Sequence, residues 1–203
     1  MKEKIIALIL MFILMALLPF AAAKCSDNNT STNTMSTADT PKKPSETKDY
    51  GKTLCALLAA KYDESYSSET LKALAIILNT NYKVNPNSFS DDDYLTQDKA
   101  SGSMKEIYPM IRKAADYAKE KTLCINHKAF YVPFSSVSNG STVQSGDYSY
   151  LQPIASTWDC YSSDFSEEAK CVGVSINGVN YLCKNGSSAE NALLWYLPGF
   201  EIE

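Results

Sequence analysis

The chain of 203 residues contains a single histidine, His127. One histidine excludes the HExxH helix of zinc peptidases, the three-histidine zinc site and the iron site of two histidines and one carboxylate. No CxxC pair occurs, which excludes zinc-ribbon and thioredoxin-like sites. The formal net charge of −4 offers no basic excess and argues against a nucleic-acid-binding protein. We therefore expect no metal, no cofactor and no nucleic-acid partner.

The N-terminal residues 1–23 predict export. Lys2 and Lys4 precede an apolar run at 5–20, which three alanines at 21–23 follow. A positive start, an apolar centre and small residues at the end are typical of a cleaved signal peptide. The run is also long enough for a retained membrane anchor, so both alternatives stay open. Either way, the rest of the chain is expected outside the cytoplasm, secreted or anchored to the outer face of the cytoplasmic membrane, with membrane contact only through this segment.

Residues 24–49 are rich in Ser, Thr and Asn and contain no aromatic residue. Such a segment cannot bury enough apolar surface to offset the entropy of ordering, so it predicts a disordered linker. The folded domain is then expected at 50–203. Five of the six cysteines lie in it, and export permits disulfides. If any pair forms, Cys160 with Cys171 is the first expectation; the alternative is that the cysteines are small buried side chains.

Apolar spacing predicts several helices in the domain. Leu54, Leu57 and Leu58 mark one helical face, and a second helix begins after a Ser67 or Ser68 cap and ends before Pro86. A third is expected from a capping box of Ser103 and Glu106, with Pro109 awkwardly inside it. A short final helix is expected at 188–197, where Pro198 and Gly199 end it.

The middle of the domain has the sequence pattern of strands and loops instead of helices. Apolar runs on either side of residues 126–128 predict a hairpin with His127 exposed on its turn, followed by a Ser- and Gly-rich loop at 135–150. The three aspartates at 91–93 lack the glycine and distal glutamate of a calcium-binding EF-hand loop, so they predict a solvated loop. The expected fold class is α+β: a single domain with N-terminal helices, a strand-rich middle and a C-terminal helix.

Four segments and the end of the domain carry a resemblance to a known family. They are ETLKALAIILNT at 69–80, PFSSVSNGST at 133–142, YL at 150–151 with STWD at 156–159, VGVSINGVNYLCKNG at 172–186, and the ending LWYLPGFEI at 194–202. In this order they resemble the ExLKAQAVAART helix, the FxSxSxGxT loop, the YL…SxWD stretch, the VGMSQYGANAMAKEG segment and the YYPGxEI end of the stage II sporulation protein D family. That family includes the amidase enhancers of bacterial cell-wall turnover.

The resemblance implies the fold of that domain and a role on peptidoglycan. Family members of the sporulation type are lytic transglycosylases that act on glycan strands stripped of stem peptides. Their glutamic acid protonates the glycosidic oxygen, a step that needs a carboxyl group with a raised pKa. In this chain the aligned position is Lys61. A lysine side chain is a poor replacement because its ammonium group holds its proton too tightly near neutral pH. Asp63 or Glu64 would then have to act as the catalytic acid.

Other positions of the family's groove also differ. They hold Leu74, Asn79, Lys170 and Ile176 where the family has Gln, Arg, His and Gln. The remaining side chains suit sugar hydroxyls and a pyranose ring, and the glycan-binding candidates are Thr80, Ser136, Ser138, Asn139, Gly140, Thr142, Trp158 and Asp159. A purely structural turn is the alternative for the loop residues, and a core position is the alternative for Trp158.

Three hypotheses about function follow. The first is a non-catalytic exported protein that binds glycan strands or activates a wall hydrolase, such as an amidase, during sporulation or wall remodelling. The second is an active lytic transglycosylase that uses Glu64 or Asp63. The third is a protein-interaction domain that does not bind glycan.

Overall fold

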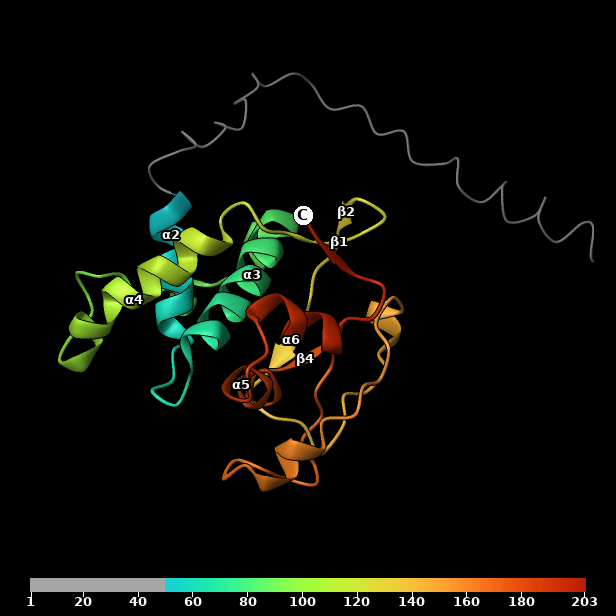
Figure 1. The fold of residues 1–203 in the computed structure, drawn as a ribbon. Helices are drawn as coiled ribbons and strands as arrows, with labels where there is room; N and C mark the ends of the chain where they lie inside the picture. The colour runs from blue at the N-terminus through green and yellow to red at the C-terminus, as the bar shows by residue number, and fades with distance from the viewer. Residues whose placement is uncertain (1–49) are drawn as a thin grey trace, which may run out of the picture. The chain divides into compact units, whose positions relative to one another are not determined.

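The computed structural model describes residues 50–203, which all belong to one of the two compact units into which the chain divides (Figure 1). The predictions for the export segment at 1–23 and the linker at 24–49 lie outside the described residues. Among the residues that are described, no helix is both long and apolar enough to cross a membrane.

Helix α3 (Ser68–Val84) is the centre of this unit. Four further helices contact it: α2 (Tyr50–Ala60), α4 (Ser103–Ala118), α5 (Ile176–Lys184) and α6 (Ala189–Tyr196). Figure 1 shows α3 with α2 and α4 on one side and α5 and α6 on the other. Every apolar side chain at 71–78 is at most 1% exposed. A helix that is apolar on all sides belongs in the middle of a core.

The predicted boundaries of α3 are confirmed. The Ser67 side chain accepts a hydrogen bond from the backbone N–H of Thr70, which caps the first turn. The helix ends at Val84, two residues before Pro86, because a proline disfavours helical geometry in the residue that precedes it. The predicted first helix corresponds to α2. The predicted last helix corresponds to α6, which the Ser188 side chain caps.

Helix α4 begins differently from the prediction. Its N-cap is Gly102, at a φ of 55°, with no side-chain cap, so the capping box of Ser103 and Glu106 is wrong: Ser103 is already the first helical residue. Pro109 is tolerated inside the helix, on its exposed side. The opposite side buries Tyr108 and Ile111 together with three alanines, and this packing holds the helix across the proline.

The described residues form two small sheets. In the first, β1 (Leu123–Ile125) pairs antiparallel with both β2 (Lys128–Ala129) and β5 (Glu201–Ile202). In the second, β3 (Phe134–Ser135) pairs in parallel with β4 (Val174–Ser175). The predicted hairpin is therefore confirmed, and its turn holds Asn126 and His127 at φ values of 50° and 61°. Two successive positive φ values suit a tight hairpin turn, and His127 is exposed as expected.

The fold class is mixed helix and sheet, but a strand-rich middle is wrong. Strands β3 and β4 have two residues each, and the chain between them consists mainly of turns and two short 3₁₀ helices. Serine hydroxyls of this region bond to nearby backbone groups instead: Ser138 accepts from the N–H of Gly140, Ser162 from that of Asp164, and Ser166 from that of Glu168. Asp91–Asp93, expected in a solvated loop, forms an exposed to half-exposed 3₁₀ turn.

The Cys160–Cys171 disulfide is not formed. All five cysteines of the described residues are unpaired; four are buried and only Cys160 is exposed. Burial raises the pKa of the Cys171 and Cys183 thiols to about 11. These two are therefore packed, protonated side chains rather than nucleophiles.

Polar residues of α3 tie neighbouring segments to it. Asn79 is fully buried, and its side-chain amide donates to the carbonyls of Ala118, at 2.8 Å, and Lys121, at 2.7 Å. The Asn79 carbonyl accepts a hydrogen bond from the Tyr50 hydroxyl. One side chain thus satisfies the end of α4 and fixes the start of α2. Asn79, expected at a groove position, has a structural role.

We predict that Asn79→Leu lowers the free energy of unfolding by about 2 kcal/mol, because the carbonyls of Ala118 and Lys121 and the Tyr50 hydroxyl lose their partner. The measurement is urea denaturation followed by circular dichroism. The control is Asn87→Leu at an exposed position, which should change stability by no more than about 0.5 kcal/mol. Equal effects from the two substitutions would show that the hydrogen bonds of Asn79 do not matter.

Candidate functional site

A cavity of about 440 Å³ lies where the end of α2, the middle of α3, β3 and the start of α5 come together. Four of the positions assigned to the family's groove line it: Lys61, Leu74, Ser136 and Ile176. The other lining residues are mainly aromatic or hydroxyl-bearing: Tyr66, Ser88, Phe89, Asp93, Tyr131, Pro133, Phe134, Ser135 and Tyr148. Positions that are more than 100 residues apart in the sequence thus share one cavity.

The chemistry of this cavity is that of hydrogen bonding and ring contact. The rings of Tyr131 and Tyr148 stack with their centroids 6.0 Å apart. Burial raises the pKa of Tyr66 to about 12, so its hydroxyl stays protonated near neutral pH. Neutral hydroxyls and aromatic faces together suit a polyhydroxylated ligand such as a saccharide.

The cavity has one carboxyl group, on Asp93, and Lys61 holds it as an anion. The Lys61 ammonium donates to Asp93 Oδ1 at 2.7 Å. The Asp93 carboxylate also accepts from the backbone N–H of Ser90, at 2.9 Å. The hydrogen bond from Lys61, followed by the one from Ser90, lowers the pKa of Asp93 to about 2. A group that is already ionised cannot protonate a glycosidic oxygen.

Asp63 and Glu64, the predicted substitutes for the catalytic acid, do not line the cavity. Both are exposed in the turn that follows α2. The side chain of Asp63 accepts from the backbone N–H of Ser65 at 2.8 Å, and hydrogen bonding to Ser65 lowers its pKa. A general acid needs the opposite shift, so the Asp63 environment does not fit that role.

Ser138 and Asp159 meet, but inside the protein rather than on a binding surface. Asp159 is fully buried, and its Oδ2 accepts from the backbone N–H of Ser138 at 3.0 Å and its hydroxyl at 2.6 Å. Ser156 donates to the same oxygen at 2.8 Å, and Asn177 donates to Oδ1 at 2.7 Å. Because these donors occupy the carboxylate, Asp159 joins the loop, the 3₁₀ helix at Thr157–Tyr161 and α5.

Thr80 and Thr142 are buried as well. Thr80 donates to the Ile76 carbonyl and accepts from the backbone N–H of Leu123, which attaches β1 to α3. Thr142 accepts from the backbone N–H of Ile154 and holds two loop segments together. Both hydroxyls are thus engaged inside the protein: Thr142 has the structural role that was the alternative for the loop, and Thr80 bonds within and beside α3.

The remaining loop candidates are more accessible. Ser136 is exposed at the cavity, and Asn139 is exposed outside it, where its amide donates to the Glu167 carbonyl at 3.3 Å. Gly140 has a φ of 103°, which a residue with a side chain rarely adopts. A Cβ there would also press on the Cys160 sulfur, so the glycine serves the turn.

Trp158 belongs to a group of aromatic rings at the surface. It stacks on Tyr181 with centroids 5.2 Å apart and an angle of 7°, and the Trp195 ring lies 6.0 Å away. The indole N–H of Trp158 donates to the Tyr196 hydroxyl at 3.0 Å, which fixes the ring. Trp158 itself is half-buried, whereas Trp195 is 52% exposed and Tyr181 48%. The accessible ring surface is therefore largely that of two residues that the sequence analysis did not select.

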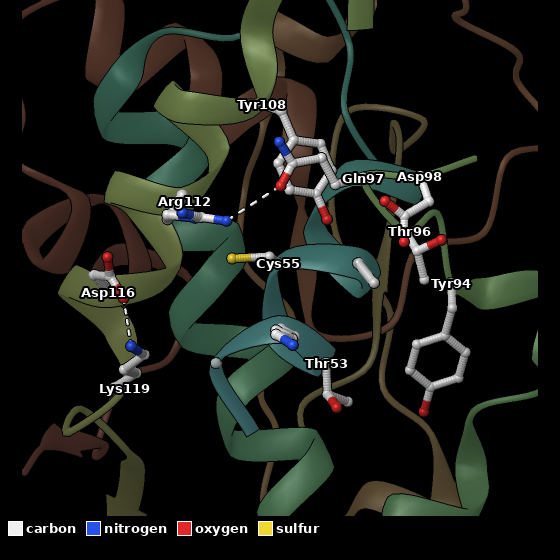
Figure 2. Close-up of a pocket in the computed structure, with 13 residues that line it drawn as sticks. Thr53, Cys55, Tyr94, Thr96, Gln97, Asp98, Tyr108, Arg112, Asp116 and Lys119 are labelled. Atoms are coloured by element: carbon white, nitrogen blue, oxygen red, sulfur yellow. Dashed lines mark hydrogen bonds and ion pairs between the residues drawn. The ribbon is translucent and has the colours of Figure 1, made fainter. Parts of the chain in front are cut away.

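A second and larger cavity of about 660 Å³ lies between α2, α4 and residues 94–98. Figure 2 shows Arg112 of α4 directed at Gln97, to which it donates at 3.2 Å, beside the Cys55 thiol of α2. Asp116 and Lys119 form an ion pair at its edge. Burial raises the pKa of Cys55, so this thiol is not an activated nucleophile. None of the predicted site residues lines this cavity.

No family model matches the chain, and no curated protein matches it.

We predict that Asp159→Ala lowers the free energy of unfolding by about 3 kcal/mol, because the buried hydroxyls of Ser138 and Ser156 and the half-buried amide of Asn177 lose a carboxylate acceptor. Urea denaturation followed by circular dichroism measures the change. Asp147→Ala removes an exposed carboxylate from the same region and should have almost no effect. If the two variants are equally stable, the buried network does not support the loop.

The ion pair of Lys61 and Asp93 gives a prediction with a defined pH dependence. Both side chains are partly exposed, so solvent screening limits their coupling energy near pH 7 to about 0.5–1 kcal/mol. The folded-state pKa of Asp93 is lowered from 3.8 to about 2. The stabilisation is therefore present above about pH 4 and is lost as the pH falls through about 2.

A double-mutant cycle of Lys61→Met and Asp93→Asn, measured by urea denaturation along a pH series, checks this dependence. The control cycle replaces Asp93→Asn by Asp91→Asn, an exposed neighbour, and should show no coupling to Lys61. A Lys61–Asp93 coupling that is unchanged at the acid end of the series would contradict the assignment.

Proposed function

We propose that the protein is an exported cell-wall protein that binds peptidoglycan glycan strands without cleaving them. The observation that carries this proposal is the composition of the 440 Å³ cavity. Its walls offer hydroxyls and aromatic rings, while its one carboxyl group, on Asp93, is held as an anion by Lys61. Such a site has the groups that bind sugars and lacks the protonated acid that cleaves between them.

The resemblance to the stage II sporulation protein D family supports the choice of ligand. Among the positions that it assigns to one groove are Lys61, Leu74, Ser136 and Ile176. These four residues line one cavity. On this proposal the domain is a non-catalytic relative of the lytic transglycosylases, and its fold is similar to theirs. Its partners are the glycan strand and a wall amidase or other wall hydrolase that it positions or activates during sporulation or wall remodelling.

The alternative of an active transglycosylase that uses Glu64 or Asp63 has less support. Both carboxylates are exposed outside the cavity, and the pKa of Asp63 is lowered rather than raised. The alternative of a protein-interaction domain without glycan binding is decided by the binding experiment below.

We predict that the full-length chain, kept in mild detergent because of its apolar N-terminus, co-sediments with peptidoglycan strands stripped of stem peptides. Tyr148→Ala should weaken binding about tenfold, a loss of about 1.4 kcal/mol, because it removes a ring from the cavity. The matched control is Tyr161→Ala: Tyr161 is 91% exposed and lies outside the cavity, so binding should not change. Absence of binding by the unmodified chain overturns the proposal and favours a protein partner.

The same samples, digested and analysed by mass spectrometry, should contain no anhydro-muramoyl ends. We predict that Lys61→Glu restores cleavage, because the new carboxyl faces Asp93 and two neighbouring carboxylates hold a proton between them at neutral pH. Lys52→Glu adds the same group outside this cavity and should give no product. Anhydro ends released by the unmodified chain would show that it is an enzyme, and Glu64→Gln and Asp63→Asn would then identify its acid.

A further inference from the structure

The hairpin turn and the last strand bring three metal-binding side chains together, far along the chain from the cavity residues. They are His127 on the turn between β1 and β2, and Glu201 and Glu203 on and just after β5. Strands β1 and β5 pair with Cys124 opposite Glu201. Because side chains two residues apart in an extended strand point to the same side, Glu201 and Glu203 share one side of the sheet.

The contacts among these residues are specific. The backbone N–H of His127 donates to Glu201 at 3.1 Å, and His127 Nδ1 is hydrogen-bonded to the Glu203 carboxylate. His127 Nδ1 also lies 3.9 Å from the nearest oxygen of Glu201. One ligand atom from each of the three residues lies within 4.8 Å of the other two.

These distances suit one divalent ion. Nitrogen and carboxylate ligands bind zinc at about 2.0–2.2 Å, which places ligand atoms about 3–3.5 Å from one another. The three side chains would therefore move closer by little more than an ångström, and all three are exposed enough to rotate. One imidazole and two carboxylates form a donor set that Mn²⁺, Fe²⁺ and Zn²⁺ accept.

The local charge also favours a cation. Within residues 50–203, no lysine or arginine forms an ion pair with Glu201 or Glu203, whose ionic partner is His127. Lys128, which follows His127 in the chain, lies over the Phe130 ring, and Lys83 donates to Thr122, whose backbone pairs with that of Glu203. Two carboxylates on one side of a strand end repel each other, and a divalent ion between them removes that repulsion.

We propose that His127, Glu201 and Glu203 form a binding site for a first-row divalent transition-metal ion. The ion joins the hairpin turn to the end of β5 and keeps its remaining coordination positions for water. The site is independent of the glycan-binding proposal. The sequence motifs did not indicate this site because they concern metal sites with two or three histidines. This site needs one histidine and two carboxylates, and the carboxylates reach the turn only because β5 pairs with β1.

The single histidine makes the test direct. In the full-length chain without a histidine tag, the imidazole proton signals in the NMR spectrum come from His127 alone. Substoichiometric Mn²⁺ should broaden these signals before those of other aromatic side chains. The Glu201→Gln, Glu203→Gln double variant should need at least about tenfold more Mn²⁺ for the same broadening.

The matched control is the Asp91→Asn, Asp147→Asn double variant, which removes two accessible carboxylates elsewhere and should behave like the unmodified chain. Circular dichroism establishes that both double variants are folded. Calorimetry with Zn²⁺, in a Cys25→Ser, Cys160→Ser background that removes competing thiols, should give a stoichiometry of one. Broadening that is uniform over all aromatic signals, or unchanged in the Glu201 and Glu203 variant, overturns the proposal.

Discussion

The burial of α3 on all sides is the constraint on which the rest of the described structure depends. A helix in this position can carry polar side chains only where each finds a partner, because an unpaired buried donor or acceptor is costly. Within residues 50–203 no buried side-chain nitrogen or oxygen lacks a partner. Thr70 bonds to Asn180 of α5, Asn79 to the end of α4, Thr80 to β1, and Asn81 to Val132 just before β3. The polar residues of one helix thus position four other segments.

This arrangement explains which parts of the fold were predictable. The ends of α3 follow from Ser67 and Pro86, and the hairpin follows from the turn residues, because these signals are local. The start of α4 at Gly102 and the whole of α5 were not predictable in this way. Gly178 lies inside α5, where a glycine normally disfavours a helix. A glycine is needed there because a Cβ would overlap the Tyr196 hydroxyl. This is a tertiary contact that no local sequence pattern contains.

The sequence predicted the types of residue in the candidate site better than it predicted where those residues lie in the fold. Ser138, Thr142 and Asp159 have the side chains that bind sugars, but the same hydrogen-bonding groups serve the interior of a loop with little regular structure. Sequence alone does not distinguish the two uses, because burial decides between them. The tyrosines that line the cavity carried a weak signal, since 13 tyrosines are many for this length, but nothing local says which of them converge.

The pair of Lys61 and Asp93 connects the structure to the proposed function. In a partly enclosed cavity a lone carboxyl group would tend to keep its proton, which is the condition for general acid catalysis. A lysine 2.7 Å away reverses that tendency and stabilises the anion. The backbone N–H of Ser90 holds the same carboxylate in place, so Asp93 is both ionised and fixed. Leu74 and Ile176 line the same cavity with apolar surface, which offers no route for relaying a proton. On the proposed function, the hydroxyls and rings of the cavity would orient a saccharide, and the Lys61–Asp93 pair would withhold the proton that cleavage needs.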